Sequence, residues 1–214
     1  MIKSFFRRLL GWITTAVVGL INLIRWKQKD PVSDEDLSKI REMLTKDYYL
    51  ICVRSSNLLS AWMVGLTDWW MTGKFGFYAH CLMNLEDEVQ SDDDFRLVEA
   101  TPRHGVSYNS FRKVFKNASS VALLKPRTFS MEEWTKVMDR AKGYVGSKYD
   151  TLFDFARDNK LSCIELIRDA LKADPNYNTN YANFEALLKK YGKITPNMLY
   201  DCPDFEIVFE VRNG

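Results

Sequence analysis

The sequence predicts an α+β fold in which an antiparallel β-sheet is packed with helices. Several short runs are rich in aromatic and β-branched residues, as strands are, and the polar residues 90–94 are expected to form a turn between two of them. Other segments repeat apolar residues at a spacing of three or four, as amphipathic helices do. Hydrophobic residues make up 46% of the 214 residues, which is enough to bury a substantial core.

Composition excludes several classes of function. Lys and Arg number 30 against 28 Asp and Glu, and this near balance gives no electrostatic case for a nucleic acid partner. The four cysteines form no CxxC pair, so the sequence predicts neither a disulfide framework nor a zinc ribbon. With only two histidines in the chain, a metal site is not expected either. We therefore predict no cofactor.

The chain divides into residues 1–30 and a domain over residues 31–214. Residues 9–24 carry no charge and lie between basic residues on both sides. As a helix they would cover about 24 Å, against about 30 Å for a hydrocarbon core. A cleaved secretory signal, a membrane anchor or interfacial helix, and a helix buried between subunits all fit, although no small-residue cleavage site follows. We predict a helix buried in membrane lipid or neighbouring subunits.

In the first half of the domain, the sequence pattern predicts a capped helix, a second apolar segment and three strands. After Pro31, Ser33 or Asp34 can cap a helix over residues 36–46. Residues 58–70 are apolar and include Trp62, Trp69 and Trp70, so a helix or a loop packed on the core is expected there. The three strands are predicted at 48–54, 74–85 and 95–100.

In the second half of the domain, the sequence pattern predicts mainly helices. Ser130 can cap an amphipathic helix that continues to Tyr144. The remaining predicted elements are a short strand at 121–125, helices at 161–171 and 181–191, and an alternating edge strand at 205–211.

Cys163 is the best candidate for a nucleophile. Ser162 and Glu165 have the spacing of a capping box, which would make Cys163 the first residue of a helix. The helix dipole and free backbone N–H groups there favour a thiolate, and they could also hold an oxyanion. The alternative is a small side chain that faces the core.

The other three cysteines fit a nucleophile less well. Cys52 lies inside an apolar strand, where a buried thiol is inert. Cys81 follows His80, but neighbours on a strand point to opposite faces. Cys202 lies between two carboxylates, which would raise its pKa.

His80 and Glu99 are the candidates for the base and for the group that orients it. His80 lies in a predicted strand, whereas His104 lies in a predicted turn. If the strands at 74–85 and 95–100 pair as a hairpin, Glu99 would come beside His80 and orient its ring. Alternatively, His80 is a packed or surface residue and Glu99 is solvated.

The order of these motifs resembles the circularly permuted NlpC/P60 group of papain-like, YiiX-like cysteine hydrolases, over residues 48–211. The motifs are GFYAHCLM, RLVEATPRHGV and KYDTLFDFARDNKLSCIELIRDAL, followed by ITP before the last strand. The resemblance implies a permuted papain-like fold with Cys163 as nucleophile, His80 as base and Glu99 as the third member. Where the family commonly has an aromatic residue before the cysteine and a serine after it, this chain has Ser162 and Ile164.

The resemblance implies a thiol-dependent amide hydrolase whose substrates are peptidoglycan peptides of the bacterial cell wall. The apolar residues 1–30 then favour a membrane-associated or cell-envelope location, or a phage virion protein that degrades the wall during infection. A lipid-directed acyltransferase or thioesterase is the first alternative, with the three tryptophans lining an apolar groove near Cys163. The second is a structural or membrane-penetrating virion protein whose site is a relic.

Overall fold

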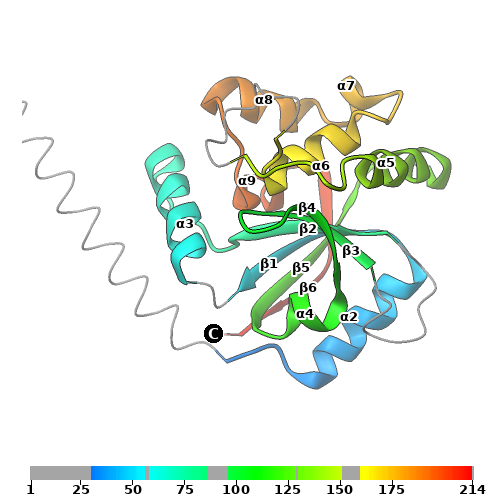
Figure 1. Cartoon of the computed structure of the whole chain (residues 1–214). Coiled ribbons are helices and arrows are strands. Elements are labelled where there is room, and N and C mark those ends of the chain that lie inside the picture. The colour runs from blue at the N-terminus through cyan, green and yellow to red at the C-terminus, as the bar shows by residue number, and fades with distance from the viewer. Residues whose placement is uncertain (1–29, 56–57, 86–95, 129, 151–159, 214) are drawn as a thin grey trace, which may run out of the picture.

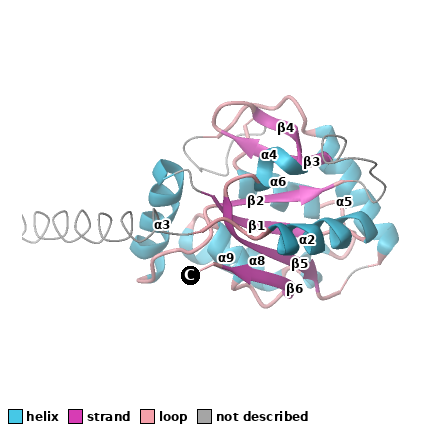
Figure 2. Ribbon diagram, turned by 90° about the horizontal axis from the view of Figure 1, so that it is seen from below, coloured by secondary structure: helices cyan, strands magenta, loops and turns pink. Residues whose placement is uncertain are grey.

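The computed structural model describes residues 30–55, 58–85, 96–128, 130–150 and 160–213, which form one antiparallel sheet with helices on both faces (Figure 1). The sheet has six strands in the order β4-β3-β2-β1-β5-β6, and Figure 2 shows them side by side in this order. The strands are β1 (Leu50–Ser55), β2 (His80–Asn84), β3 (Arg96–Thr101), β4 (Gly105–Ser110), β5 (Ala118–Pro126) and β6 (Phe205–Arg212). The predicted α+β class is confirmed.

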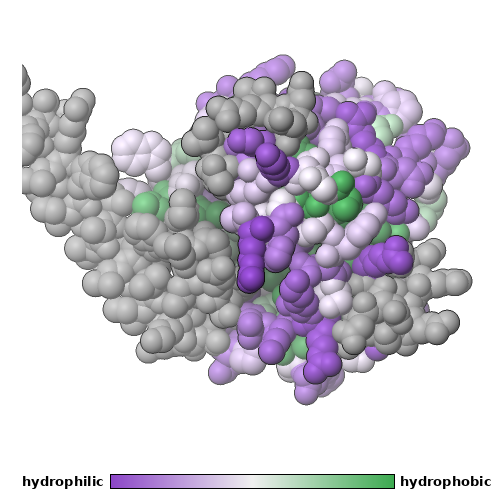
Figure 3. Space-filling model, in the orientation of Figure 1, coloured by the Kyte–Doolittle hydropathy of each residue, from purple (hydrophilic) through white to green (hydrophobic). Residues whose placement is uncertain are grey.

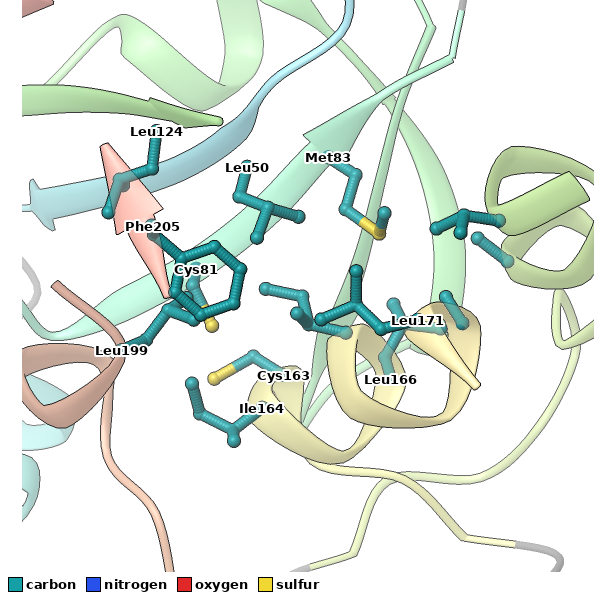
Figure 4. Close-up of a cluster of buried hydrophobic side chains, with 14 of the residues drawn as sticks. Leu50, Cys81, Met83, Leu124, Cys163, Ile164, Leu166, Leu171, Leu199 and Phe205 are labelled. Atoms are coloured by element: carbon teal, nitrogen blue, oxygen red, sulfur yellow. The ribbon is translucent and has the colours of Figure 1, made fainter. Parts of the chain in front are cut away.

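The central strands are buried on both faces, which makes the sheet the middle layer of the domain. In β1, Leu50 and Cys52 belong to the core on one face, while Ile51 and Val53 belong to the core on the other. This alternation follows from the two-residue period of a strand. Figure 4 shows part of the first core, in which β2 and β5 face the cysteine-bearing helix α6.

Helices cover both faces of the sheet (Figure 1). The face with α6 also carries α5, α7, α8 and α9, while α2 and α4 lie across the strands on the other (Figure 2), and α3 stands at one end. The bounds are α2 (Asp34–Lys46), α3 (Leu58–Thr72), α4 (Phe111–Phe115), α5 (Met131–Gly143), α6 (Cys163–Leu171), α7 (Tyr177–Asn180), α8 (Ala182–Tyr191) and α9 (Pro196–Tyr200).

Local capping signals place three helix starts. Ser33 caps α2 by accepting from the backbone N–H of Asp36, so the helix begins two residues earlier than predicted. Ser130 and Ser162 each form a complete capping box, at the starts of α5 and α6. Each cap satisfies N–H groups that have no partner within the helix.

The structure corrects the predicted elements in several places. The strand predicted at 74–85 begins only at His80, because the backbone N–H groups of Phe77 and Tyr78 bond to the side chain of Asn197 instead of to a strand. Strand β4 and helix α4 were not predicted, and β5 is longer than expected at both ends. Of the two alternatives expected for residues 58–70, the structure shows the helix, which extends to Thr72.

Two predictions concern parts of the chain outside the described residues. The apolar helix over residues 1–30 lies there, apart from Asp30, and so does the turn at 90–94. Among the helices that the structure describes, none has both the length and the apolar character needed to cross a membrane.

Candidate active site

The capping box at the start of α6 fixes the position of Cys163. The Ser162 side chain accepts from the backbone N–H of Glu165 at 3.4 Å, and the Glu165 side chain accepts from the backbone N–H of Ser162 at 2.7 Å. Both residues are buried, and Cys163 follows as the first helical residue with only 5% of its surface exposed. The sulfur therefore lies at the positive end of the helix dipole, which favours a thiolate.

His80 and Glu99 form a hydrogen-bonded pair at the start of β2. The two atoms His80 Nε2 and Glu99 Oε2 are 2.7 Å apart. Strands β2 and β3 pair antiparallel with Met83 opposite Val98, and continuing this register places Glu99 diagonally from His80. The Glu99 side chain is 8% exposed and that of His80 is 23% exposed, so the imidazole is partly open to solvent while the carboxylate is buried.

Asn109 holds the other oxygen of Glu99. Its side-chain nitrogen donates to Glu99 Oε1 from the neighbouring strand β4. Burial opposes the charge of Glu99, but the hydrogen bonds from His80 and Asn109 outweigh it and lower the pKa of the carboxyl group. Glu99 is therefore ionised and oriented from both sides. Sequence reasoning missed Asn109, because β4 itself was not predicted.

Electrostatics favour a charged His80. Burial disfavours the imidazolium, yet the hydrogen bonds and the charges of Cys163 and Glu99 raise the pKa of His80 to about 10. Since Glu99 binds Nε2, Nδ1 is the ring nitrogen that remains for a proton transfer with Cys163. A histidine charged in the folded state stabilises the fold below its ordinary pKa of 6.5, and this contribution is lost as the pH rises through about 10.

The same contacts lower the pKa of Cys163 well below its usual value. The largest cause is the hydrogen bond from the Cys81 thiol, burial opposes it, and the hydrogen bond and charge of His80 add to the lowering. The backbone N–H of Cys81 contributes as well. A thiolate at Cys163 and an imidazolium at His80 are thus the favoured charge states near neutral pH.

Cys81 is a second residue whose part in the site was missed. Figure 4 shows the sulfur atoms of Cys81 and Cys163 directed toward each other across the space between β2 and α6. Burial raises the pKa of Cys81 well above its usual value, and the neighbouring Cys163 adds to the rise, so Cys81 keeps its proton and donates it. The sequence argument set Cys81 aside as a nucleophile because strand neighbours point to opposite faces. It did not consider Cys81 as a hydrogen-bond donor to Cys163.

Three further features of the site region are the phenol of Tyr149, the indole of Trp70 and the groups that could hold a metal ion. Burial and the neighbouring Cys163 raise the pKa of Tyr149, so its phenol also keeps its proton near the site. Trp70, one of the three tryptophans of the acyl-groove hypothesis, is 80% exposed on α3. Within the described ranges, no group of three His, Cys, Asp or Glu residues is placed to hold a metal ion.

Comparisons with known proteins identify the family of the chain. A model of the family described as permuted papain-like amidase enzymes, YaeF/YiiX, C92 family, matches residues 66–209, more than half of the chain. The chain belongs to this family. The matched range includes the three candidate catalytic residues, Cys163, His80 and Glu99.

A solved structure shares the fold of this permuted papain-like protein. It is the crystal structure of the metalloprotein YiiX from Escherichia coli O157:H7, with a TM-score of 0.52 and 17% sequence identity. The match covers 79% of this chain and 97% of that one. No curated protein matches the sequence. The permuted papain-like fold implied by the resemblance is confirmed.

Replacing Cys81 with alanine should slow alkylation of Cys163 by iodoacetamide at pH 6. The substitution removes the strongest donor to the thiolate, so the pKa of Cys163 rises and less thiolate is present. Each unit of rise slows the reaction about tenfold below the new pKa. Mass spectrometry of the labelled peptide measures the rate.

Cys52→Ala is the matched control for Cys81→Ala. Cys52 is also buried near Cys163, but its hydrogen bond goes to the backbone oxygen of Pro196 at 3.7 Å. Its removal should leave the alkylation rate of Cys163 unchanged. Equal rates for Cys81→Ala and Cys52→Ala would show that the Cys81 thiol gives the thiolate no specific support.

Proposed function

We propose that this member of the permuted papain-like amidases hydrolyses amide bonds through a thioester on Cys163. The observation that carries the proposal is the hydrogen-bonded series of His80, Glu99 and Asn109 together with Cys163 at the start of α6, where His80 lowers the pKa of the thiol. Each contact fixes the next group and favours the charged pair that a cysteine nucleophile requires.

The first half of the reaction forms the thioester. The Cys163 thiolate attacks the amide carbon, and the carbonyl oxygen takes the negative charge of the tetrahedral intermediate. The backbone N–H of Cys163, at the open start of α6, is available to stabilise that charge. His80 then gives its proton to the leaving amine, and the C–N bond breaks. Glu99 keeps the ring oriented and offsets its charge.

The second half releases the acid. Water attacks the thioester carbon while neutral His80 accepts a proton from the water. The C–S bond breaks, and the thiolate of Cys163 leaves with His80 again protonated. Glu99 remains ionised throughout, since its contacts with His80 and Asn109 favour the carboxylate form.

Peptidoglycan peptides of the cell wall are the substrates that we propose, in line with the resemblance to the NlpC/P60 group. The hydrophilic character of much of the described surface in Figure 3 suits a polar substrate. Residues 1–30 would bring the enzyme to a cell envelope or hold it in a phage particle, where cell wall degradation would be its task.

An acyltransferase or thioesterase acting on lipids is the second candidate. It is favoured by helix α3, which includes Asp68 as its one charged residue and exposes 80% of Trp70 beside the domain. Such a surface suits contact with acyl chains.

One assay distinguishes the two candidates. Purified protein is incubated separately with peptidoglycan fragments and with acyl esters, and the products are identified by mass. New amino and carboxyl ends in the peptides support the amidase, whereas release or transfer of acyl groups supports the alternative. Cys163→Ala should be inactive, and Cys202→Ala should be active because Cys202 lies in contact with Asp204, with its pKa raised to about 12 chiefly by burial.

The chain from about Pro31 onward should fold and stay soluble without the preceding residues, whereas the full chain should bind liposomes or oligomerise. The described domain is anchored at its start, because the Val32 N–H donates to Ala118 and the Asn213 side chain donates to the Pro31 carbonyl. Gel filtration and liposome flotation measure both forms. A full chain that remains monomeric and ignores liposomes would contradict the predicted role of residues 1–30.

A further inference from the structure

A buried polar network lies directly before the histidine strand. Asp68 of α3, Thr195 at the cap of α9 and Asn197 within α9 make up this network, which we call the Asn197 network. Thr195 donates to Asp68 Oδ1, and Asn197 Nδ2 lies 2.5 Å from Asp68 Oδ2. Asp68 is 2% exposed and Thr195 is 5% exposed.

The Asn197 side chain binds the backbone that leads into β2. Its Oδ1 accepts from the backbone N–H groups of Phe77 and Tyr78, each at 2.6 Å, and its Nδ2 also donates to the Tyr78 carbonyl at 2.7 Å. The next residue, Ala79, donates its N–H to Val53 of β1 at 3.1 Å, and His80 follows. The backbone is thus held at three successive residues immediately before His80.

Asp68 determines which way the Asn197 amide points. Burial raises the pKa of Asp68 to about 6, against the hydrogen bonds from Thr195 and Asn197, so near neutral pH it is a carboxylate. A carboxylate only accepts hydrogen bonds, so the NH₂ group of Asn197 must face it. The amide oxygen must then face the Phe77 and Tyr78 N–H groups.

Gly76 is required by the close approach of this network. A Cβ atom at Gly76 would come 2.0 Å from Asp68 Oδ2 and 2.3 Å from Asn197 Nδ2. Both positions are far inside van der Waals contact. A side chain at position 76 therefore displaces the network or the segment that it holds.

We propose that Asn197 is a positioning residue for His80, which fixes the start of β2 so that the imidazole stays within reach of Cys163. The proposal rests on the proposed function, since it assigns Asn197 a part in that reaction. Asn197 acts through the backbone of residues 77–79 and touches neither His80 nor Cys163 in any contact described above. Small displacements of a catalytic group cost large factors in rate, so such fixation matters.

The test measures the pH dependence of Cys163 alkylation by iodoacetamide in the full chain. The midpoint of this dependence reports the pKa of the thiol, which the nearby imidazolium lowers. His80→Ala should raise the midpoint. Asn197→Ala should also raise it, by about one pH unit, which slows alkylation about tenfold below the midpoint.

Asn84→Ala is the matched control because Asn84 is the last residue of the same strand and holds backbone in the same way. It accepts from the Tyr49 N–H at 2.6 Å and donates to the Leu44 and Asp47 carbonyls at 2.9 and 2.8 Å. We expect Asn84→Ala to lower thermal stability as Asn197→Ala does, but to leave the alkylation midpoint unchanged.

Two further variants make the result decisive. Gly76→Ala perturbs the network from the segment itself, and it should raise the midpoint even if Asn197→Ala does not fold. In the His80→Ala background, Asn197→Ala should add nothing, because its effect passes through His80.

The outcomes separate this proposal from the proposed function. If His80→Ala raises the midpoint but Asn197→Ala and Gly76→Ala do not, the positioning role is wrong while the charged pair stands. The positioning role is also wrong if Asn197→Ala acts equally with and without His80, or if Asn84→Ala has the same effect. If His80→Ala itself has no effect, the charged pair and this proposal both fail.

Discussion

Replacing Cys163 or His80 with alanine should each reduce amide hydrolysis by a factor on the order of 10⁴ to 10⁶, if the pair acts as it does in hydrolases with a nucleophile and a base. Cys163 supplies the nucleophile that forms the thioester, and His80 moves the protons in both halves of the reaction. Steady-state kinetics on the substrate identified by mass provide the measurement.

The losses from Cys163→Ala and His80→Ala should not add, because the two residues form one unit. The double variant should therefore be about as inactive as either single variant. Cys202→Ala controls for loss of a buried cysteine, and circular dichroism verifies folding. Activity retained by a folded Cys163→Ala protein would overturn the mechanism.

Glu99→Gln should lower kcat by a factor on the order of 10² to 10⁴ while leaving KM nearly unchanged. Glutamine keeps the shape of the side chain but presents either oxygen or nitrogen to His80 Nε2, and it removes the charge that supports the imidazolium. The pKa of His80 should fall, so the alkaline limb of the pH–rate profile should move to lower pH.

Asn109→Ala distinguishes orientation of Glu99 from its charge. It removes the donor to Glu99 Oε1 but leaves the carboxylate, so the loss in kcat should be smaller than that of Glu99→Gln. The alkaline limb should move less as well. A Glu99→Gln profile identical to that of the wild type would exclude Glu99 from the site.

Local signals explain why parts of the fold could be predicted from the sequence. The capping boxes at Ser130 and Ser162 lie within four residues each, so their patterns are visible in the chain itself. The class followed from such local patterns together with the strand-like runs. The segment at 74–79 was assigned to a strand because it is aromatic, but its backbone partner is Asn197, 120 residues beyond Phe77.

Local sequence signals likewise predicted some residues of the candidate site and missed others. Cys163 could be chosen from its helix start, and the pairing of two predicted strands brought His80 together with Glu99. Asn109 and Cys81 could not be found, because their parts depend on strand register and on packing between β2 and α6. Residues that act across elements leave little signal in a single sequence.

The charge state of Cys163 is the most direct test of the account. Wild-type protein should be treated with substoichiometric iodoacetamide near neutral pH, and the labelled peptides should be counted by mass spectrometry. We expect Cys163 to react well before Cys52, Cys81 and Cys202, because burial is the largest cause that raises the pKa of each of the other three thiols. Preferential labelling of Cys202, or a Cys163 rate that rises only near pH 9, would contradict the thiolate–imidazolium pair.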